Sequence, residues 1–347
     1  MGSSPNGRPA RSTSTSSTSS SSFTGIARIA RRPCRELGPN STRLIGHGLV
    51  AWTRHLKQDV RIRSARQEDR EKVVPFCTGT FDWGDYIDEV FDLWVKDQEG
   101  SLLVADVDGQ PAGILHVRLM KHGWAWLEGL RVDPRHRRAG LATALNLAAL
   151  SFLKERGYRN VRLFIEANNL PSMQLAYKLG FTEAFRWKFY HGRRPVLAES
   201  RYSSVVGREK ASETWDRLDG SDLFSRLGRC YEMSWAMHPL EREDFIELVD
   251  DGRVFRSGSG EDMALVISGP EEGHPRALRA CFLMGSPKMV KDLASFVLRK
   301  ALRQGFREVR AASPDQPEVV AGLRSARFRP GFSTTLVYTM DLRGLRP

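Results

Sequence analysis

The chain has 347 residues, of which 41% are hydrophobic and 27% are charged, a composition typical of a globular protein of about two domains. Its net charge of +12 arises mainly in residues 1–60, where nine Arg and Lys face only two acids, so the remaining chain does not predict a nucleic-acid-binding domain. The four cysteines are widely spaced without a C-x-x-C pair, which excludes an ordinary zinc module and predicts neither a bound metal nor a disulfide framework.

Residues 1–57 are predicted to form a disordered or targeting tail. Ser12–Ser22 is almost entirely Ser and Thr, and such a run cannot bury enough apolar surface to offset its ordering entropy. The basic, Ser-rich and acid-poor composition is also that of an organelle transit peptide. No apolar run reaches the length of a transmembrane helix. We therefore expect a soluble cytoplasmic protein without a membrane partner, or an organelle protein if the tail is a targeting segment.

A regular pattern of strands and helices begins at residue 58. Apolar periodicity and turn signals predict, in order, a strand at 60–63, helices at 66–76 and 81–96, strands at 101–107, 112–120 and 124–132, a helix at 140–156, a strand at 160–167, a helix at 171–179 and a strand at 184–190. This order predicts an α+β domain over residues 58–195, with a mixed, mostly antiparallel sheet flanked by helices.

A second block follows a polar stretch at 196–225, which is predicted to be an irregular linker. Residues 226–347 show helical patterns at 245–249, 288–302 and 318–326 and strand patterns at 263–268, 277–284, 307–311 and 334–340. The segments Gly157-Tyr-Arg-Asn-Val-Arg162 and Gly305-Phe-Arg-Glu-Val-Arg310 match at four of six positions. Each follows a long helix and precedes a strand, a helix and another strand, which indicates an internal repeat and a second α/β domain.

The segment from Trp124 to Leu147 joins a strand, a polar turn and a helix. Asp133-Pro134 ends the strand, because proline cannot donate a hydrogen bond to the sheet. The first turn of the following helix offers unpaired amide N–H groups and the positive end of the helix dipole, which together suit a phosphate. Arg137 and Arg138 add positive charge, and Gly140 allows close approach of the backbone.

The turn within this segment, Arg137-Arg138-Ala139-Gly140-Leu141-Ala142, fits the acetyl-CoA signature Q/R-x-x-G-x-G/A. The strand ending in Val132-Asp-Pro before it, and Asn169 and Leu179-Gly-Phe181 after it, stand at the spacing usual for the same family. Residues 60–190 therefore resemble a GNAT-superfamily N-acetyltransferase. The resemblance implies the GNAT fold, with acetyl-CoA as cosubstrate and no metal.

The resemblance also implies which residues contact the cofactor. Backbone amides from Arg138 to Thr143 are expected to hold the CoA pyrophosphate, and the strand around Leu130 to Val132 is expected to splay from its neighbour and pair with the pantetheine arm. The expected cofactor-binding residues are Leu130, Arg131, Val132, Arg137, Arg138, Ala139, Gly140, Leu141, Ala142, Thr143 and Asn169.

Glu128 is the candidate general base. An ammonium substrate must lose a proton before it attacks a thioester, and a carboxylate in an apolar strand just before the cofactor loop suits proton transfer or amine binding. Strand alternation predicts Trp126, Glu128, Leu130 and Val132 on one face and Leu127, Gly129 and Arg131 on the other. The alternative is a structural salt bridge from Glu128 to Arg131 or Arg162.

Tyr177 is the candidate general acid, but its position differs from that of the family. The family tyrosine usually precedes the glycine of the Leu-Gly-Phe ending by four residues, and that position here is Ala176. One residue rotates a helical side chain by about 100°. We therefore interpret Tyr177 as a packing residue rather than a catalytic one.

The acceptor side is predicted at residues 81–94, because the first two helices and their loop cover this site in the family. The candidate substrate-binding residues are Phe81, Asp82, Asp85 and Tyr86. Their aromatic and acidic character suits a cationic acceptor and resembles histidine acetyltransferase-like members. The alternative is the solvated face of an amphipathic helix.

The resulting interpretation is a tandem GNAT protein with an active first copy and a degenerate second copy that lacks the signature. It is expected to transfer an acetyl group to a primary amine of a small molecule or amino acid, by direct attack in a ternary complex. The alternatives are an acetyltransferase of protein lysines or N-termini and a non-catalytic acyl-CoA-binding regulator. The sequence does not predict the oligomeric state.

Overall fold

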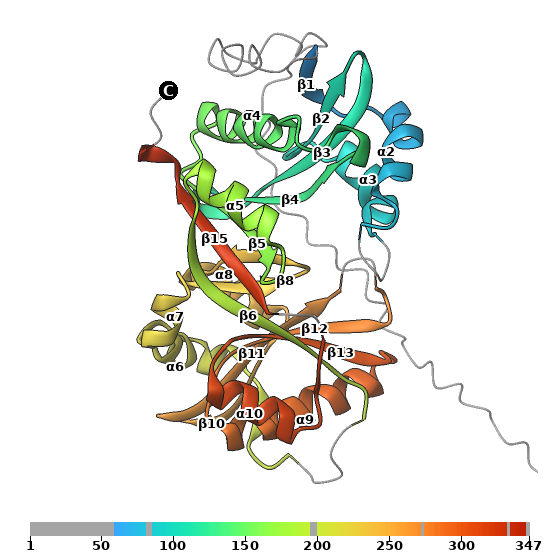
Figure 1. Ribbon diagram of the computed structural model, residues 1–347. Helices are drawn as coiled ribbons and strands as arrows, with labels where there is room; N and C mark the ends of the chain where they lie inside the picture. The colour runs from blue at the N-terminus through green and yellow to red at the C-terminus, as the bar shows by residue number, and fades with distance from the viewer. Residues whose placement is uncertain (1–58, 81–84, 195–199, 272–273, 332–333, 345–347) are drawn as a thin grey trace, which may run out of the picture. The chain divides into compact units, whose positions relative to one another are not determined.

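The computed structural model describes residues 59–80, 85–194, 200–271, 274–331 and 334–344 (Figure 1). These residues all belong to one compact unit. The predicted tail at 1–57 and the candidate residues Phe81 and Asp82 lie outside the described residues. Within the described ranges, no helix combines the length and apolar character that crossing a membrane requires.

The first half contains the predicted elements in the predicted order. They are β1 (Val60–Ser64), α2 (Arg70–Cys77), α3 (Ile87–Val95), β2 (Ser101–Val107), β3 (Gln110–Leu119), β4 (Trp124–Val132), α4 (Leu141–Glu155), β5 (Asn160–Glu166), α5 (Leu170–Leu179) and β6 (Thr182–Gly192). Helix α4 packs on the sheet because Leu141, Leu145 and Ala149 recur at helical spacing and are fully buried.

The second half begins with ordered elements in place of the predicted irregular linker. Residues 203–226 form β7 (Ser203–Val205), α6 (Arg208–Asp219) and α7 (Asp222–Arg226), so the expectation of an irregular segment at 196–225 is wrong. Helix α6 forms because Ala211, Trp215 and Leu218 recur at helical spacing and are buried. The charged residues between them make the composition of the segment polar.

The rest of the second half alternates strands and helices. The elements are β8 (Cys230–Met233), β9 (Ala236–Pro239), α8 (Arg242–Asp250), β10 (Val254–Ser259), β11 (Asp262–Pro270), β12 (Ala277–Met284), α9 (Pro287–Arg303), β13 (Glu308–Pro314), α10 (Pro317–Ser325), β14 (Arg329–Pro330) and β15 (Thr335–Asp341). Strands β8, β9 and β10 are additional to the elements that the sequence pattern predicted.

Strands of both halves join in one thirteen-stranded sheet with the order β1-β2-β3-β4-β5-β15-β6-β13-β12-β11-β10-β7, and β14 also pairs with β6. Strand β15, from the end of the chain, lies antiparallel between β5 and β6 of the first half (Figure 1). The long strand β6 pairs with β15 over Thr182–Trp187 and with β13 over Trp187–Gly192. Each half is therefore completed by a strand that the other half supplies.

The predicted internal repeat is present at the level of elements. In each half a parallel strand pair is connected by the long helix: β4 with β5 through α4, and β12 with β13 through α9. Gly157 and Gly305 follow these helices with φ of 77° and 92°, the left-handed conformation that ends a helix at glycine. The division into domains at 58–195 and 226–347 remains a prediction, since the strand exchange joins the two regions.

Candidate functional site

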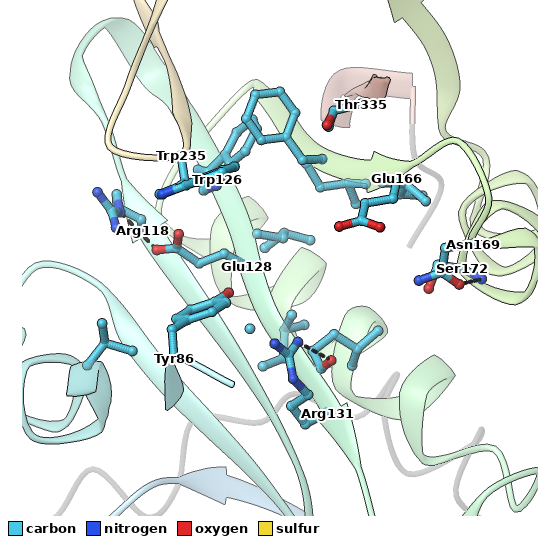
Figure 2. Close-up of a pocket in the computed structure, with 18 of the residues that line it drawn as sticks. Tyr86, Arg118, Trp126, Glu128, Arg131, Glu166, Asn169, Ser172, Trp235 and Thr335 are labelled. Atoms are coloured by element: carbon cyan, nitrogen blue, oxygen red, sulfur yellow. Dashed lines mark hydrogen bonds and ion pairs between the residues drawn. The ribbon is translucent and has the colours of Figure 1, made fainter. Parts of the chain in front are cut away.

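The main cavity lies where strands β4 and β5 separate. Their parallel pairing ends at Leu127 and Leu163, although both strands continue for several residues. The cavity has a volume of about 620 Å³ and is lined by residues of β4, β5, α3 and α5 together with a group from the second half. Figure 2 shows Glu128 and Arg118 on one side of it, Asn169 and Ser172 on the opposite side, and the Glu166 carboxylate between them.

Strand β4 carries a β-bulge at this position. Glu128 pairs with His116 and Arg131 pairs with Ile114, so Gly129 and Leu130 together oppose the single residue between those partners. Gly129 has a φ of 69°, and a Cβ there would lie 2.5 Å from a ring carbon of Trp94. The position thus requires glycine for both its conformation and its contact.

The bulge corrects the predicted alternation of β4. Beyond Gly129, Leu130 and Val132 pack in the same core cluster as Leu127, whereas Arg131 turns to Asp85 at the cavity. The sequence pattern predicted that Leu130 and Val132 share a face with Glu128 and that Arg131 lies on the opposite face. This prediction is therefore wrong. An inserted residue reverses the alternation of all residues after it.

Glu128 is a buried carboxylate held from two sides. His116 Nδ1 and Arg118 Nε each lie 2.9 Å from Oε1 of Glu128. Burial raises the pKa of Glu128, but the charge of Arg118 and the hydrogen bond with His116 outweigh it, so the pKa lies below its ordinary value. Of the two partners expected for a structural salt bridge with Glu128, Arg131 pairs with Asp85, and Arg162 lies over the Trp124 ring.

His116 continues this network toward the surface. Its Nε2 lies 3.5 Å from Asp97 Oδ2, and its ring stacks on Trp94 with centroids 4.3 Å apart. Burial lowers the pKa of His116, but the two flanking carboxylates raise this pKa by a larger amount, so the net shift is upward. The interaction with His116 is also the main reason why the pKa of Asp97 falls to about 2. These contacts favour the protonated form of the imidazole.

The described candidates on the acceptor side both line the cavity. Asp85 accepts hydrogen bonds from Arg131 Nε at 2.7 Å and from its Nη2 at 3.2 Å. The Arg131 guanidinium lies 5.4 Å from the centre of the Tyr86 ring. Burial raises the pKa of the Tyr86 hydroxyl to about 12. Asp85 therefore holds Arg131 at the cavity wall in addition to any contact with an acceptor.

The signature loop precedes α4 with an unusual backbone. Arg138 and Gly140 both adopt left-handed conformations, with φ of 65° and 86°, and no side chain caps the helix that begins at Leu141. Left-handed residues next to ordinary ones direct successive N–H groups toward one anion. Residues 137–143 lie outside the cavity lining, whereas Leu130, Arg131 and Asn169 belong to it. Asn169 also caps α5 by accepting a hydrogen bond from the Ser172 amide.

The two candidate positions for a general acid differ in their surroundings. Ala176 is buried and lines the cavity, whereas Tyr177 is 62% exposed and does not line it. The Tyr177 ring makes an edge contact with Tyr338, with centroids 6.1 Å apart. Tyr177 therefore lies away from the cavity lining, and its interpretation as a packing residue stays a prediction.

The second half contributes to the cavity through residues that the sequence analysis did not single out. Five lining residues come from it: Ser234, Trp235, His274, Arg310 and Thr335. Ser234 and Trp235 form the tip of the β8–β9 hairpin with φ of 50° and 64°, a strained conformation for non-glycine residues. Glu232, fully buried with Arg279, accepts a hydrogen bond from the Trp235 amide and fixes this tip.

His116 and Arg118 are also missing from the sequence-based candidates. The sequence pattern that could have identified them is their alternation as polar residues in an otherwise apolar strand, next to the strand that carries Glu128. Pairing the two predicted strands would have placed both side chains beside Glu128. Trp235 and Arg310 had no such signal, since only the tertiary fold brings them to the first half.

Known proteins resemble this chain at the level of both sequence and fold. Residues 62–181 match the model of the Acetyltransferase (GNAT) family. A mycothiol acetyltransferase from Clavibacter sepedonicus is 39% identical over 101 residues, 29% of this chain and 33% of the relative. A histidine N-acetyltransferase from Xenopus tropicalis is 29% identical over 100 residues, 28% of this chain and 31% of the relative. The chain thus spans about a third of the length of these two relatives.

The fold comparison extends over most of the chain. A GCN5-related N-acetyltransferase from Sphaerobacter thermophilus superimposes with a TM-score of 0.57 and 16% identity, covering 83% of this chain and 96% of that structure. At this identity the likeness concerns the fold alone. It extends the GNAT-type architecture beyond residues 62–181 into the second half.

Proposed function

Because residues 62–181 match the model of the Acetyltransferase (GNAT) family, we propose that the protein is an acetyl-CoA-dependent N-acetyltransferase of a small-molecule primary amine. In the reaction a neutral amine attacks the acetyl thioester, an amide bond forms and the CoA thiol leaves. The observation that carries the proposal is the Glu128 carboxylate at the wall of the cavity between the separated strands β4 and β5.

The residues around the cavity fit a CoA thioester on one side. The uncapped start of α4 and the left-handed backbone of Arg138 and Gly140 suit the pyrophosphate, with Arg137 adding charge. The separated part of β4, at Leu130 to Val132, has no β5 partner and suits the extended pantetheine arm. Bound acetyl-CoA supplies the activated acetyl group, and Asn169 lies on the same side of the cavity.

Glu128 serves the amine side in this proposal. Its lowered pKa keeps it a carboxylate at neutral pH, so it attracts an ammonium group and accepts a proton directly or through a water. Arg118 and His116 fix the carboxylate, which keeps its orientation toward the cavity. The network from Glu128 through His116 to Asp97 gives the proton a path toward the surface.

Two further observations support direct transfer to a small molecule. Cys77 is a poor covalent carrier, because burial raises the pKa of its thiol to about 12. The β8–β9 hairpin and other parts of the second half line the cavity, and this enclosure favours a small acceptor over a peptide in an open groove. Acetylation of protein amines and CoA binding without turnover remain the alternative proposals.

The Glu128→Gln variant tests the proposed role of the carboxylate. The rate of acetyl transfer should fall by about 10²- to 10⁴-fold, because the amine loses its proton acceptor. The rate is measured on a panel of amines and amino acids from the free CoA thiol that the reaction releases. Binding of acetyl-CoA, measured by calorimetry, should stay unchanged. The exposed Glu155→Gln on α4 provides a control that removes the same charge away from the cavity.

Unchanged transfer by Glu128→Gln near neutral pH would exclude the proposed role. A large loss in Glu166→Gln instead would assign the role to Glu166, a second glutamate that lines the cavity. If the wild-type protein binds acetyl-CoA but acetylates no amine and no protein lysine or N-terminus, the regulator alternative gains support.

A further inference from the structure

A second cavity adjoins the main one in the second half of the chain. It has a volume of about 570 Å³, and its lining residues are Arg193, His274, Pro275, Arg276, Ala277, Arg307, Glu308 and Arg310. His274 and Arg310 line both cavities, so the two spaces are neighbours. Four arginines surround this second cavity, and Glu308 is the one carboxylate among its lining residues.

The charges of this cavity are only partly compensated. Glu308 accepts hydrogen bonds from Arg193 Nε at 2.7 Å and from Arg310 Nε at 2.9 Å, so its single negative charge is shared between two arginines. Arg276 and Arg307 are exposed. Among the described residues, neither of them forms an ion pair with a carboxylate. Positive charge that gathers in a concave surface attracts anions.

The sheet register brings Arg276 and Arg307 together. Arg276 and Arg307 immediately precede the parallel strands β12 and β13, whose first pair is Ala277 with Glu308. The Arg307 amide donates to the Arg276 carbonyl at 2.7 Å, so the two residues are neighbours across the strands. Like charges on adjacent strands destabilise the fold, and an oxyanion between them removes this cost. Partial desolvation of the exposed His274 and the charge of Arg310 lower the pKa of His274, consistent with a positive field.

We infer that this cavity binds an oxyanion of the acceptor, which is therefore an amine that also carries a carboxylate or a phosphate monoester. The inference rests on the proposed function, since it places the acceptor amine at Glu128 and its acidic group at Arg276 and Arg307. Arginine suits both groups because its planar guanidinium donates two parallel hydrogen bonds to an oxyanion.

Matched acceptor pairs test the inference and identify the anion. Glucosamine 6-phosphate is compared with glucosamine, and triglycine with triglycine amide, in acetyl transfer by the full chain. In at least one pair the anionic member should have a kcat/KM about 10- to 100-fold higher. The double variant Arg276→Gln/Arg307→Gln should abolish this preference, mainly through KM, while the neutral member is unaffected. Arg303→Gln/Arg324→Gln, which removes the same charge from exposed positions elsewhere, should retain it.

Binding measurements separate failure of this inference from failure of the proposed function. Calorimetry with CoA-saturated protein measures binding of each anionic probe and its neutral counterpart without requiring transfer. Tighter binding of an anionic probe that the Arg276→Gln/Arg307→Gln variant loses supports the site, even if no amine is acetylated. Equal affinity for charged and neutral members in both pairs, or a preference that survives in the double variant, overturns the inference.

Discussion

At the scale of single residues, the site depends on how Glu128 is held. His116 and Arg118 bind one oxygen of its carboxylate, and Gly129 creates the bulge that places Arg131 on the same side. Such a buried set is stable only while its charges are balanced, because an unpaired buried charge costs several kcal/mol. The protonation of His116 therefore links the site to pH.

The stability of the fold should depend on pH through His116. Its pKa is raised in the folded protein, so its contribution to stability is complete below the ordinary value of 6.5 and is lost as pH rises through the raised value. Urea unfolding at several pH values should show that His116→Gln is most destabilising near pH 6 and less so near pH 9. The lowered pKa of Glu128 gives the opposite dependence in acid, where its contribution is lost as pH falls. An equal effect of His116→Gln at every pH would contradict a charged His116.

At the scale of elements, the signature loop and α4 form one functional piece. The loop places two left-handed residues immediately before Leu141, where the helix starts without a side-chain cap. A helix start of this kind has amide hydrogens and a positive dipole end available to a ligand. The backbone amides at the start of α4 are close together because their residues are neighbours along the chain. The motif can therefore be identified from the sequence without knowledge of the tertiary fold.

Replacement of Gly140 by Asp should abolish acetyl-CoA binding, with a loss of affinity on the order of 100-fold or more, because a carboxylate would stand where the phosphates are expected. Asp is among the non-glycine residues that best tolerate a left-handed backbone such as that of Gly140, so the variant should remain folded. Calorimetry with acetyl-CoA measures the affinity. Gly157→Asp is the matched control, since Gly157 is also left-handed, has open space around a Cβ and lies at the other end of α4. Normal CoA binding by Gly140→Asp would show that the loop assignment is wrong.

At the scale of the whole molecule, the two halves share one sheet and one cavity. Strand β15 lies between β5 and β6, and its Val337 and Tyr338 are fully buried. Removing it would expose the edges of two strands and the apolar surface between them. The first half therefore depends on the last part of the chain for its fold, although the acetyl-CoA signature lies entirely within residues 137–142.

A fragment of residues 58–195 should consequently fail to fold and to bind acetyl-CoA, as measured by circular dichroism and calorimetry. The same fragment with residues 331–344 attached through a flexible linker after β6 should recover both properties, because β15 then returns to its place between β5 and β6. A folded 58–195 fragment that binds acetyl-CoA as tightly as the full chain would contradict the need for strand exchange.

The sequence by itself determined those features whose residues are close along the chain. The strand, loop and helix from Trp124 to Glu155 and the position of Glu128 before the loop follow from local periodicity and spacing, and the loop motif carries the resemblance to the family whose model residues 62–181 match. The repeat also predicted a second half of similar construction.

Only the tertiary structure decided how these pieces meet. The bulge at Gly129 reversed the faces of β4, and hairpin pairing brought His116 and Arg118 to Glu128. The strand exchange and the β8–β9 hairpin brought Trp235, His274 and Arg310 to the main cavity. The physical reason is that these contacts depend on strand register and on pairing between distant segments, which are fixed by packing of the whole chain rather than by local propensity.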